Sequence, residues 1–313
     1  MHMKVLVTSN SFSCYSEEPN ILLKNSGFEI VKNPYGRVMD EDEFSKIVED
    51  ADAIILSTDK LSKRVIDNAK KLKIVARYGV GLDNVDVDYL KQKNIVLTTA
   101  AGCNSSAVAD YTIGLMIDVS RRISLLNSFF KRGQWKKKTG TDLWKSKVGV
   151  IGLGSIGKGV VQRLRGFECE IYAYDKYFDE KFCEDNKVKK SSLETIYKEC
   201  DFITLHIPPL PENKHLISKK ELGMMKANAV IINTARASLI DDNDLADALK
   251  NGIIFGAALD VHANEPIIDK RYAELDNVIL TPHCAAVSIK AVDQMSLKAA
   301  KDIVDFVKKG VRL

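Results

Sequence analysis

Short runs of aliphatic and β-branched residues alternate with amphipathic stretches along most of the chain. This alternation is typical of a parallel sheet whose two faces are covered by helices, so the pattern predicts an α/β fold. In the first third of the chain we expect helices over Glu41–Glu49 and Ser62–Ala69, and strands over Lys4–Thr8, Ala53–Leu56, Ile74–Ala76 and Ile95–Leu97.

A long helical pattern then interrupts the alternation. It starts near Asn104, Ser105 and Ser106, which are residue types that cap helix N-termini, and it continues to about Phe130. The last segment, about residues 287–309, is predicted to be one helix, because apolar residues recur there every three or four positions. At 313 residues the chain is long enough for two domains. Between these two helices we expect strands over Lys147–Ile151, Glu170–Tyr174, Phe202–Leu205, Ala229–Ile232, Gly256–Leu259 and Val278–Leu280.

Composition mainly excludes classes of protein. A net charge of +4 with 45% hydrophobic residues is ordinary for a globular protein. It gives no electrostatic reason to expect a nucleic acid or a membrane surface as partner. No apolar stretch is long enough for a membrane-spanning helix and no secretion signal is evident, so we expect a cytoplasmic protein. The six cysteines include no Cys-x-x-Cys pair, and we expect reduced thiols and no bound metal.

A glycine-rich turn, Gly-Leu-Gly-Ser-Ile-Gly, follows the first strand of the second alternation and precedes a helical pattern. Gly152 permits the tight turn, Gly154 lets a pyrophosphate approach the backbone, and Gly157 lets the helix pack close to the strand. The helix begins with Ser155 and Ile156, whose free N–H groups suit the phosphates. The turn therefore predicts a dinucleotide-binding site.

An acidic residue ends the next predicted strand at the spacing that such a site requires. Asp175 stands 18 residues after Gly157, close to the ~20 expected of the carboxylate that binds the adenosine ribose. A carboxylate at this position repels the extra phosphate of NADP, so we expect NAD as the cofactor. Lys176 follows directly and leaves NADP as an alternative.

Three further segments carry polar residues directly after predicted strands, where ligands bind in open α/β sheets. Hydride transfer to a 2-keto acid needs a cation for the carboxylate and a proton donor whose charged form is stabilised. Arg236 can bind a carboxylate with two parallel hydrogen bonds, and His283 can transfer the proton. Glu265 can orient and charge the imidazole. These three residues are the predicted catalytic group.

Other polar residues near these strand ends are expected to have lesser roles. His206 follows a strand, but no acid lies near it in the sequence, so we expect it to line the cofactor site together with Pro208 and Thr234. His215 and His262 are expected at the surface.

Taken together, these motifs resemble the D-isomer-specific 2-hydroxyacid dehydrogenase family over essentially the whole chain. The resemblance implies two Rossmann-like domains, with an NAD-binding domain (residues 100–286) inserted into a flavodoxin-like substrate-binding domain (residues 1–99 and 287–313). It also implies a homodimer. The matching segments, in the order of the family, are Arg77–Asp86, the helix start at Asn104, the glycine turn, His206–Pro209, and the segments of Arg236, Glu265 and His283.

The resemblance also implies roles for residues outside the catalytic group. By matching position, Asp260 would contact the nicotinamide carboxamide. The backbone N–H groups of Tyr78, Gly79 and Val80 would hold the substrate carboxylate, with Arg77 nearby. Successive exposed N–H groups in a glycine-containing loop are suited to binding an anion.

The motif Arg-x-Gly-x-Gly-x-Asp-Asn-Val-Asp is most similar to short phosphoglycerate dehydrogenases. This implies the 3-phosphoglycerate/3-phosphohydroxypyruvate pair of serine biosynthesis, with Lys60 and Arg77 as candidate cations for the phosphate. Leu56 stands where such enzymes often have an arginine, which favours the alternatives. These are a glyoxylate or hydroxypyruvate reductase, a D-lactate dehydrogenase, and an NAD-sensing co-repressor-like protein without catalytic function.

Overall fold

The computed structural model describes residues 3–267 and 269–308. The chain divides into two compact units, each with its own core. Unit 1 consists of Met1–Asn104 and Val287–Leu313, and unit 2 consists of Ser105–Ala286. The first crossing between the units thus falls at the start of a helix, a few residues after the expected boundary at residue 99.

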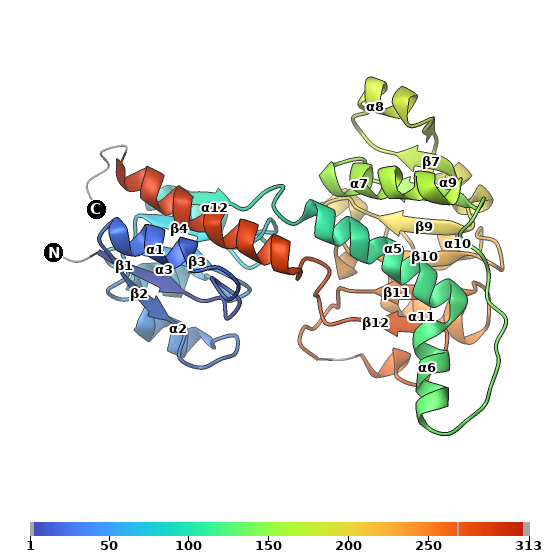
Figure 1. The fold of residues 1–313 in the computed structure, drawn as a ribbon, viewed down its shortest axis with the longest axis horizontal. Helices are drawn as coiled ribbons and strands as arrows, with labels where there is room; N and C mark the ends of the chain where they lie inside the picture. The colour runs from blue at the N-terminus through green and yellow to red at the C-terminus, as the bar shows by residue number, and fades with distance from the viewer. Residues whose placement is uncertain (1–2, 268, 309–313) are drawn as a thin grey trace. The chain divides into compact units, whose positions relative to one another are not determined.

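Unit 1 contains a parallel sheet of five strands among its described residues, in the order β2-β1-β3-β4-β5 (Figure 1). This is the flavodoxin-like order. The flavodoxin-like α/β architecture expected for this part of the chain is therefore confirmed. The strands are β1 (Met3–Val7), β2 (Phe28–Lys32), β3 (Ala53–Leu56), β4 (Ile74–Arg77) and β5 (Val96–Thr99).

Helices cover both faces of this sheet. On one face α12 packs on β4 and along α1 (Figure 1). On the other face, buried side chains of α2, α3 and α4, such as Phe44, Val65 and Leu90, share one core with strand residues. The helices are α1 (Glu18–Asn25), α2 (Glu41–Ile47), α3 (Lys63–Asn68), α4 (Val87–Gln92) and α12 (Ile289–Lys308).

The described part of unit 2 contains a parallel sheet of seven strands in the order β12-β11-β10-β9-β6-β7-β8. Renumbered within the unit, this is the Rossmann order 3-2-1-4-5-6 with one strand added beside the sixth. The strands are β6 (Lys147–Ile151), β7 (Glu170–Tyr174), β8 (Lys189–Lys190), β9 (Phe202–Leu205), β10 (Val230–Asn233), β11 (Gly256–Leu259) and β12 (Val278–Leu280).

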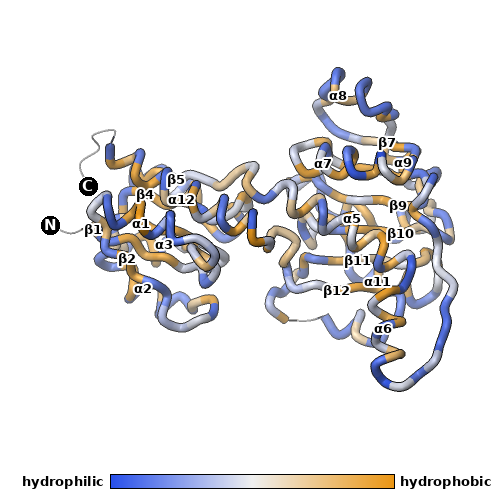
Figure 2. Tube along the Cα trace, viewed as in Figure 1, coloured by the Kyte–Doolittle hydropathy of each residue, from blue (hydrophilic) through white to orange (hydrophobic). Residues whose placement is uncertain are grey.

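The central strands of unit 2 are buried on both faces and read as continuous apolar runs, coloured orange in Figure 2. One core lies under α5 and α7, and the other under α9, α10 and α11. The helices are α5 (Ser105–Arg121), α6 (Ile123–Lys131), α7 (Ser155–Leu164), α8 (Glu180–Asp185), α9 (Leu193–Glu199), α10 (Lys219–Leu222) and α11 (Asp242–Lys250), with the 3-10 turns η1 (Arg165–Phe167), η2 (Pro211–Asn213), η3 (Ala237–Leu239) and η4 (Lys270–Tyr272).

The long helix expected up to Phe130 is two helices. Arg122 adopts a left-handed conformation with φ 56° and separates α5 from α6. The carbonyl of Ser120 accepts a hydrogen bond from the N–H of Thr141, and the carboxylate of Asp118 accepts one from the N–H of Ser124 (2.7 Å). These contacts replace helical hydrogen bonds, and the apolar periodicity that continues through the break does not reveal them.

The expected cap at the start of this helix is also corrected in part. The helix does begin at Ser105, but the Oδ1 atom of Asn104 is buried with no hydrogen-bond partner among the described residues. Among the elements of unit 1 and the strands of unit 2, those that the hydrophobic pattern did not predict are α1, α4, β2 and the two-residue strand β8. The last is too short to produce a periodic signal.

Within residues 3–267 and 269–308, no helix combines the length and the apolar character needed to cross a bilayer. The same residues contain no group of three or more His, Cys, Asp and Glu side chains placed to hold a metal ion.

Candidate active site

The glycine-rich turn of unit 2 lies at the carboxyl end of β6, and the three glycines have different surroundings. Gly152 has φ 103°, a left-handed conformation that favours glycine, and a side-chain Cβ at this position would lie 2.6 Å from the carbonyl carbon of His206. A Cβ at Gly157 would overlap the carbonyl oxygen of Gly152. A Cβ at Gly154 would meet no atom within 4 Å. Two glycines therefore build the turn, and the third leaves open space beside it.

This open space is where a pyrophosphate is expected. Helix α7 begins at Ser155, directly after Gly154, so the first N–H groups of the helix, including those of Ser155 and Ile156, have no helical acceptor. Such N–H groups, together with the helix dipole, attract phosphate oxygens. The turn therefore fits the diphosphate of a dinucleotide.

Substituting Gly154 and Gly157 separates the effect of a side chain on folding from its effect on cofactor binding. We expect Gly154→Ala to leave the melting temperature within about 2 °C of wild type, because the added methyl meets no protein atom. The same methyl occupies the phosphate approach, so NADH affinity is expected to fall at least about tenfold. Gly157→Ala is expected to lower both the melting temperature and the NADH affinity. Thermal unfolding and fluorescence titration with NADH measure the two quantities, and unchanged NADH affinity in Gly154→Ala would contradict this interpretation of the turn.

Asp175 directly follows β7, beside the glycine turn. Its carboxylate accepts hydrogen bonds from the N–H of Leu153 (2.6 Å) and from the N–H of Tyr177 (2.8 Å). The side chain thus fixes the turn and is itself oriented by it. Each carboxylate oxygen has a second lone pair, so the expected contact with the ribose is compatible with these bonds.

The turn lies at the switch point of the sheet, where β6 has β7 on one side and β9 on the other. His206 follows β9, and its N–H donates to the carbonyl of Ile151 at the end of β6 (2.7 Å). Its imidazole Nε2 pairs with the hydroxyl of Thr204 (2.9 Å). Burial lowers the pKa of His206 to about 3, so the ring is neutral near pH 7. Pro208, two residues further, is exposed.

The turn after β10 places Thr234 and Arg236. Asn233, only 1% exposed, holds both ends of this turn: its Oδ1 accepts from the N–H of Ala235 (3.0 Å) and its Nδ2 donates to the carbonyl of Arg236 (2.9 Å). The Nη1 of the half-buried Arg236 donates to the carbonyl of Ala235 (2.6 Å). The hydroxyl of Thr234 pairs with that of Thr112 from α5 (3.2 Å). A buried amide therefore fixes the backbone that carries the arginine.

Glu265 and His283 form a direct pair, although 18 residues separate them. The Nδ1 of His283 lies 2.8 Å from Oε2 of Glu265, and the other carboxylate oxygen accepts a hydrogen bond from the N–H of His262 (2.9 Å). Burial raises the pKa of Glu265, but the hydrogen bonds from His283 and His262 outweigh this, and the net pKa is lowered. Glu265 is therefore ionised near pH 7, which suits a carboxylate that stabilises an imidazolium.

Asp260 organises the segment that carries His283. Its carboxylate is 1% exposed and accepts hydrogen bonds from the hydroxyl of Thr281 (2.6 Å), from the N–H of Cys284 (3.0 Å) and from the N–H of Ala285 (2.8 Å). These bonds stabilise the left-handed conformation of His283, whose φ is 52°. The expected contact of Asp260 with the nicotinamide carboxamide stays a prediction.

Cys284 directly follows His283 in the chain but has the character of a structural thiol. Its Sγ lies 3.1 Å from the hydroxyl of Tyr111, and burial raises the pKa of the thiol above its usual value. Burial, together with the thiol contact, raises the pKa of Tyr111 to about 12. Both groups are therefore protonated near pH 7, and the thiol is not activated as a nucleophile.

In unit 1, the loop after β4 contains the N–H groups expected to bind a carboxylate. The N–H of Tyr78 donates to the carbonyl of Leu56 (2.8 Å), and the N–H of Gly79 donates to that of Arg77 (2.9 Å). Val80 is half-exposed, and its N–H has no acceptor among the described residues. Of the three expected donors, two are thus bonded within unit 1, and the predicted anion binding depends on Val80.

Arg77, expected near the substrate phosphate, holds this same loop. Its Nε donates to the carbonyl of Gly81 (2.8 Å), and its Nη1 donates to the carbonyls of Tyr78 (2.7 Å) and Leu56 (3.3 Å). The side chain is half-buried. These contacts give Arg77 a structural role in shaping the loop.

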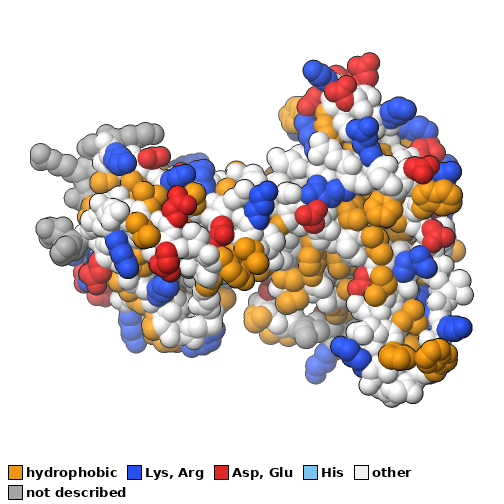
Figure 3. All heavy atoms as spheres, viewed as in Figure 1, with side chains coloured by type: hydrophobic (Ala, Val, Ile, Leu, Met, Phe, Trp, Pro, Cys, Tyr) orange, Lys and Arg blue, Asp and Glu red, His pale blue; other side chains and the backbone are white. Residues whose placement is uncertain are grey.

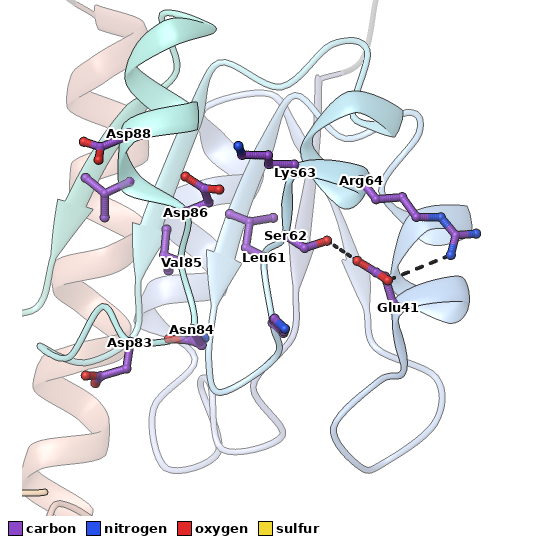
Figure 4. A pocket seen from close by; sticks show the side chains of 12 residues that line it. Glu41, Leu61, Ser62, Lys63, Arg64, Asp83, Asn84, Val85, Asp86 and Asp88 are labelled. Atoms are coloured by element: carbon purple, nitrogen blue, oxygen red, sulfur yellow. Dashed lines mark hydrogen bonds and ion pairs between the residues drawn. The ribbon is translucent and has the colours of Figure 1, made fainter. Parts of the chain in front are cut away.

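Lys60, the other candidate cation, is exposed at a shallow groove of unit 1 with a volume of about 770 Å³. Figure 4 shows this groove and labels most of its other lining residues. Glu41 in this groove pairs with Ser62 and with Arg64 (3.9 Å for the ion pair). The groove is lined by three cationic side chains and four carboxylates, so Lys60 does not stand in a positively charged pocket. The lining charges are Lys60, Lys63, Arg64, Glu41, Asp83, Asp86 and Asp88.

Two residues that sequence reasoning did not select hold the site together. Asn233 was noted only as part of a strand-end segment, and its buried amide gave no sequence signal. His262 was expected at the surface. Its ring Nε2 instead lies 2.9 Å from the carbonyl oxygen of Thr281, and its side chain is half-buried. The clue available in the sequence was its position three residues before Glu265.

Comparison with known proteins agrees with this geometry. Residues 113–285 match the family model described as "D-isomer specific 2-hydroxyacid dehydrogenase, NAD binding domain". The chain is 40% identical to D-3-phosphoglycerate dehydrogenase of Methanocaldococcus jannaschii over 87% of this chain and 52% of that protein, so it spans about half the length of this relative. It is 37% identical to glyoxylate reductase of Thermococcus litoralis over 83% of this chain and 82% of that protein.

A solved structure extends the similarity to the whole fold. The D-lactate dehydrogenase of Aquifex aeolicus, complexed with NAD and lactic acid, superposes with a TM-score of 0.82 at 26% identity, covering 97% of this chain and 96% of that one. The glycine turn of this chain, with its open space at Gly154, fits the same cofactor. The chain therefore belongs to the D-isomer specific 2-hydroxyacid dehydrogenase family, with NAD as its cofactor.

Proposed function

We propose that the protein interconverts a D-2-hydroxy acid and the corresponding 2-keto acid, with Arg236, Glu265 and His283 as its catalytic group. The observation that carries this proposal is the 2.8 Å contact between His283 and Glu265 in the same unit as the glycine turn. A histidine paired with an ionised carboxylate can give and take a proton near neutral pH. NAD, when bound, supplies the hydride acceptor and NADH the hydride donor.

Each residue of the group has a distinct role. In the reductive direction, protonated His283 donates its proton to the carbonyl oxygen of the substrate. Glu265 stabilises the imidazolium before the transfer and orients the ring through Nδ1, which leaves Nε2 for the substrate. Arg236 binds the substrate carboxylate with its planar guanidinium. Asp260 and Asn233 hold the backbone of His283 and Arg236, respectively.

The substrate we propose is a short keto acid without a phosphate, such as glyoxylate or hydroxypyruvate. Two observations support this choice over 3-phosphohydroxypyruvate. Arg77 donates to loop carbonyls, and Lys60 stands in a groove where carboxylates outnumber cations. A phosphate dianion in such surroundings loses its hydration without gaining a matching positive charge.

A phosphorylated substrate is the second candidate. It is favoured by the 40% identity to the phosphoglycerate dehydrogenase of Methanocaldococcus jannaschii. With this substrate the protein would act in serine biosynthesis, the role that the similarity of its Arg77–Asp86 motif to phosphoglycerate dehydrogenases implies. The two candidates differ in one chemical group, so a direct comparison separates them.

The deciding experiment follows NADH oxidation with glyoxylate, hydroxypyruvate, pyruvate and 3-phosphohydroxypyruvate at equal concentrations, with NADPH as a cofactor control. We expect kcat/KM to be at least about tenfold higher for an unphosphorylated acid. A preference for the phosphorylated acid that is lost in Lys60→Ala would establish the second candidate instead. NADH binding without turnover of any acid would favour the sensor function.

We also propose that the protein is a homodimer formed through unit 2. The support is a set of apolar side chains exposed on and after α6, where Figure 3 shows hydrophobic side chains at the surface. Exposed apolar clusters of this kind mark interaction surfaces. Sedimentation velocity should show twice the mass of the chain, and Phe130→Asp should reduce it to the monomer mass. The exposed residues are Ile123, Phe130, Trp135 and Trp144.

A further inference from the structure

His262 joins the two segments that carry the acid–base pair. It lies three residues after the end of β11, and Thr281 directly follows the neighbouring strand β12. The ring Nε2 of His262 lies 2.9 Å from the carbonyl oxygen of Thr281, and its backbone N–H donates to Oε1 of Glu265 (2.9 Å). Thr281 is two residues before His283. A single residue thus holds Glu265 from one side and the strand end that carries His283 from the other.

The contact with the carbonyl oxygen of Thr281 determines which ring nitrogen of His262 carries a proton. A carbonyl oxygen only accepts hydrogen bonds, so Nε2 must carry the proton, whether the imidazole is neutral or charged. The link therefore persists across the pH range in which the enzyme works. A phenylalanine has a ring of similar shape but no N–H, and a glutamine places an amide N–H near the position of Nε2.

We propose that His262 is a positioning residue for the acid–base pair, and that its ring hydrogen bond keeps the Glu265 carboxylate within hydrogen-bond distance of Nδ1 of His283. The inference rests on the proposed function, because it gives His262 a role only if that pair transfers protons. It goes beyond that function by adding a fourth residue, which acts through Glu265 and does not contact the substrate.

Two described carboxylates have a pKa that His262 affects. Glu265 and Asp269 both have a lowered pKa: the backbone hydrogen bond from His262 contributes to the lowering at Glu265, whereas His262 has the smallest effect at Asp269. Asp269 is paired with Arg271 (2.9 Å). Glu265 is thus the carboxylate that links His262 to the reacting proton. When Glu265 moves away from His283, the imidazolium loses its stabilising charge and releases its proton at lower pH.

The test compares His262→Phe with His262→Gln and wild type in keto-acid reduction across pH. In His262→Phe we expect kcat to fall about fivefold, the value of one neutral hydrogen bond, with KM for NADH unchanged. The alkaline limb of the kcat/KM profile should move to lower pH. His262→Gln should restore most of the activity and the position of the limb. If the alkaline limb of the kcat/KM profile stays at its wild-type pH in His262→Phe, the proposal is overturned, even if kcat falls.

A second readout does not depend on turnover. The imidazole proton signals of His283 can be followed by NMR during a pH titration and assigned as the set missing from His283→Asn. The chain has five histidines, so the assignment is tractable. The His283 signals should titrate at lower pH in His262→Phe and at the wild-type pH in His262→Gln. Identical titration in all three proteins overturns the positioning role. Wild-type turnover in His283→Asn would instead show that the proposed function itself is wrong.

Discussion

Replacing His283 with asparagine is expected to reduce kcat for keto-acid reduction by about a thousandfold, the middle of the range for a positioned general acid. Asparagine tolerates the left-handed conformation that the backbone has at this position, so the loop should keep its shape. It cannot donate a proton from an ionised state. NADH affinity is expected to stay within about twofold of wild type, because the glycine turn lies on other strands.

The chain contains a matched control for this experiment. His215 has φ 50°, and its Nδ1 pairs with the carboxylate of Asp241 (3.2 Å), so it reproduces both the backbone and the histidine–carboxylate contact of His283. His215→Asn should leave kcat unchanged. If the two variants lose activity equally, the loss reflects folding, and the acid–base assignment is wrong.

The pH dependence of proton transfer by His283 has opposite signs in the two directions of the reaction. His283 must be protonated to act as an acid, so kcat/KM for reduction should fall on the alkaline side of the profile. For oxidation of the hydroxy acid the same residue must be unprotonated, so kcat/KM should fall on the acid side. The lowered pKa of Glu265 keeps this carboxylate charged on both sides of neutral pH. Stopped-flow or steady-state profiles in both directions measure the two limbs.

Replacing Arg236 with lysine is expected to lower kcat/KM for the keto acid about a hundredfold, because an ammonium group cannot form the two parallel hydrogen bonds of a guanidinium. The charge is kept, so the loss isolates the geometry of the contact. Affinity for NADH should change little. Arg163→Lys is a suitable control, since Arg163 is a half-buried arginine whose partners Asp110 and Ser106 belong to α5.

Chemical rescue tests separately whether the guanidinium group of Arg236 is needed. In Arg236→Ala, added guanidinium ion should restore part of the lost activity, and an equal concentration of ammonium should not. Near-normal kcat/KM in Arg236→Lys, or a parallel loss of NADH affinity, would show that Arg236 supports the fold of the turn and does not bind substrate.

Features that depend on neighbours in the chain could be predicted from the sequence. The strands Ala53–Leu56, Lys147–Ile151, Glu170–Tyr174, Phe202–Leu205, Gly256–Leu259 and Val278–Leu280 have the predicted bounds, because buried parallel strands are short apolar runs between polar breaks.

The glycine turn could be predicted for a similar reason. The left-handed φ of Gly152 and the close approach of Gly157 are properties of a few consecutive residues. The pairing of Glu265 with His283 could be expected as well, because each residue follows one of two strands that prove to be adjacent in the sheet.

The remaining features depend on partners that are distant in the sequence. Asp260 directly follows a predictable strand, but only the fold makes it the acceptor for three groups of the segment 281–285. The helix break at Arg122 depends on Thr141, whose N–H donates a hydrogen bond to the carbonyl of Ser120. Neither contact leaves a periodic signal, because a hydrogen bond between remote residues constrains only the two groups that form it.

The sequence by itself determined the family and the cofactor, and it predicts the catalytic group, since each depends on residue type and short-range spacing. Only the tertiary structure decided which polar side chains are available for ligands. It showed that Arg77 is engaged by loop carbonyls, that Lys60 stands among carboxylates, and that His262 bonds to Thr281. A side chain can bind a ligand only with the donors, acceptors and charge that its folded neighbours leave uncompensated, and those neighbours are set by three-dimensional packing.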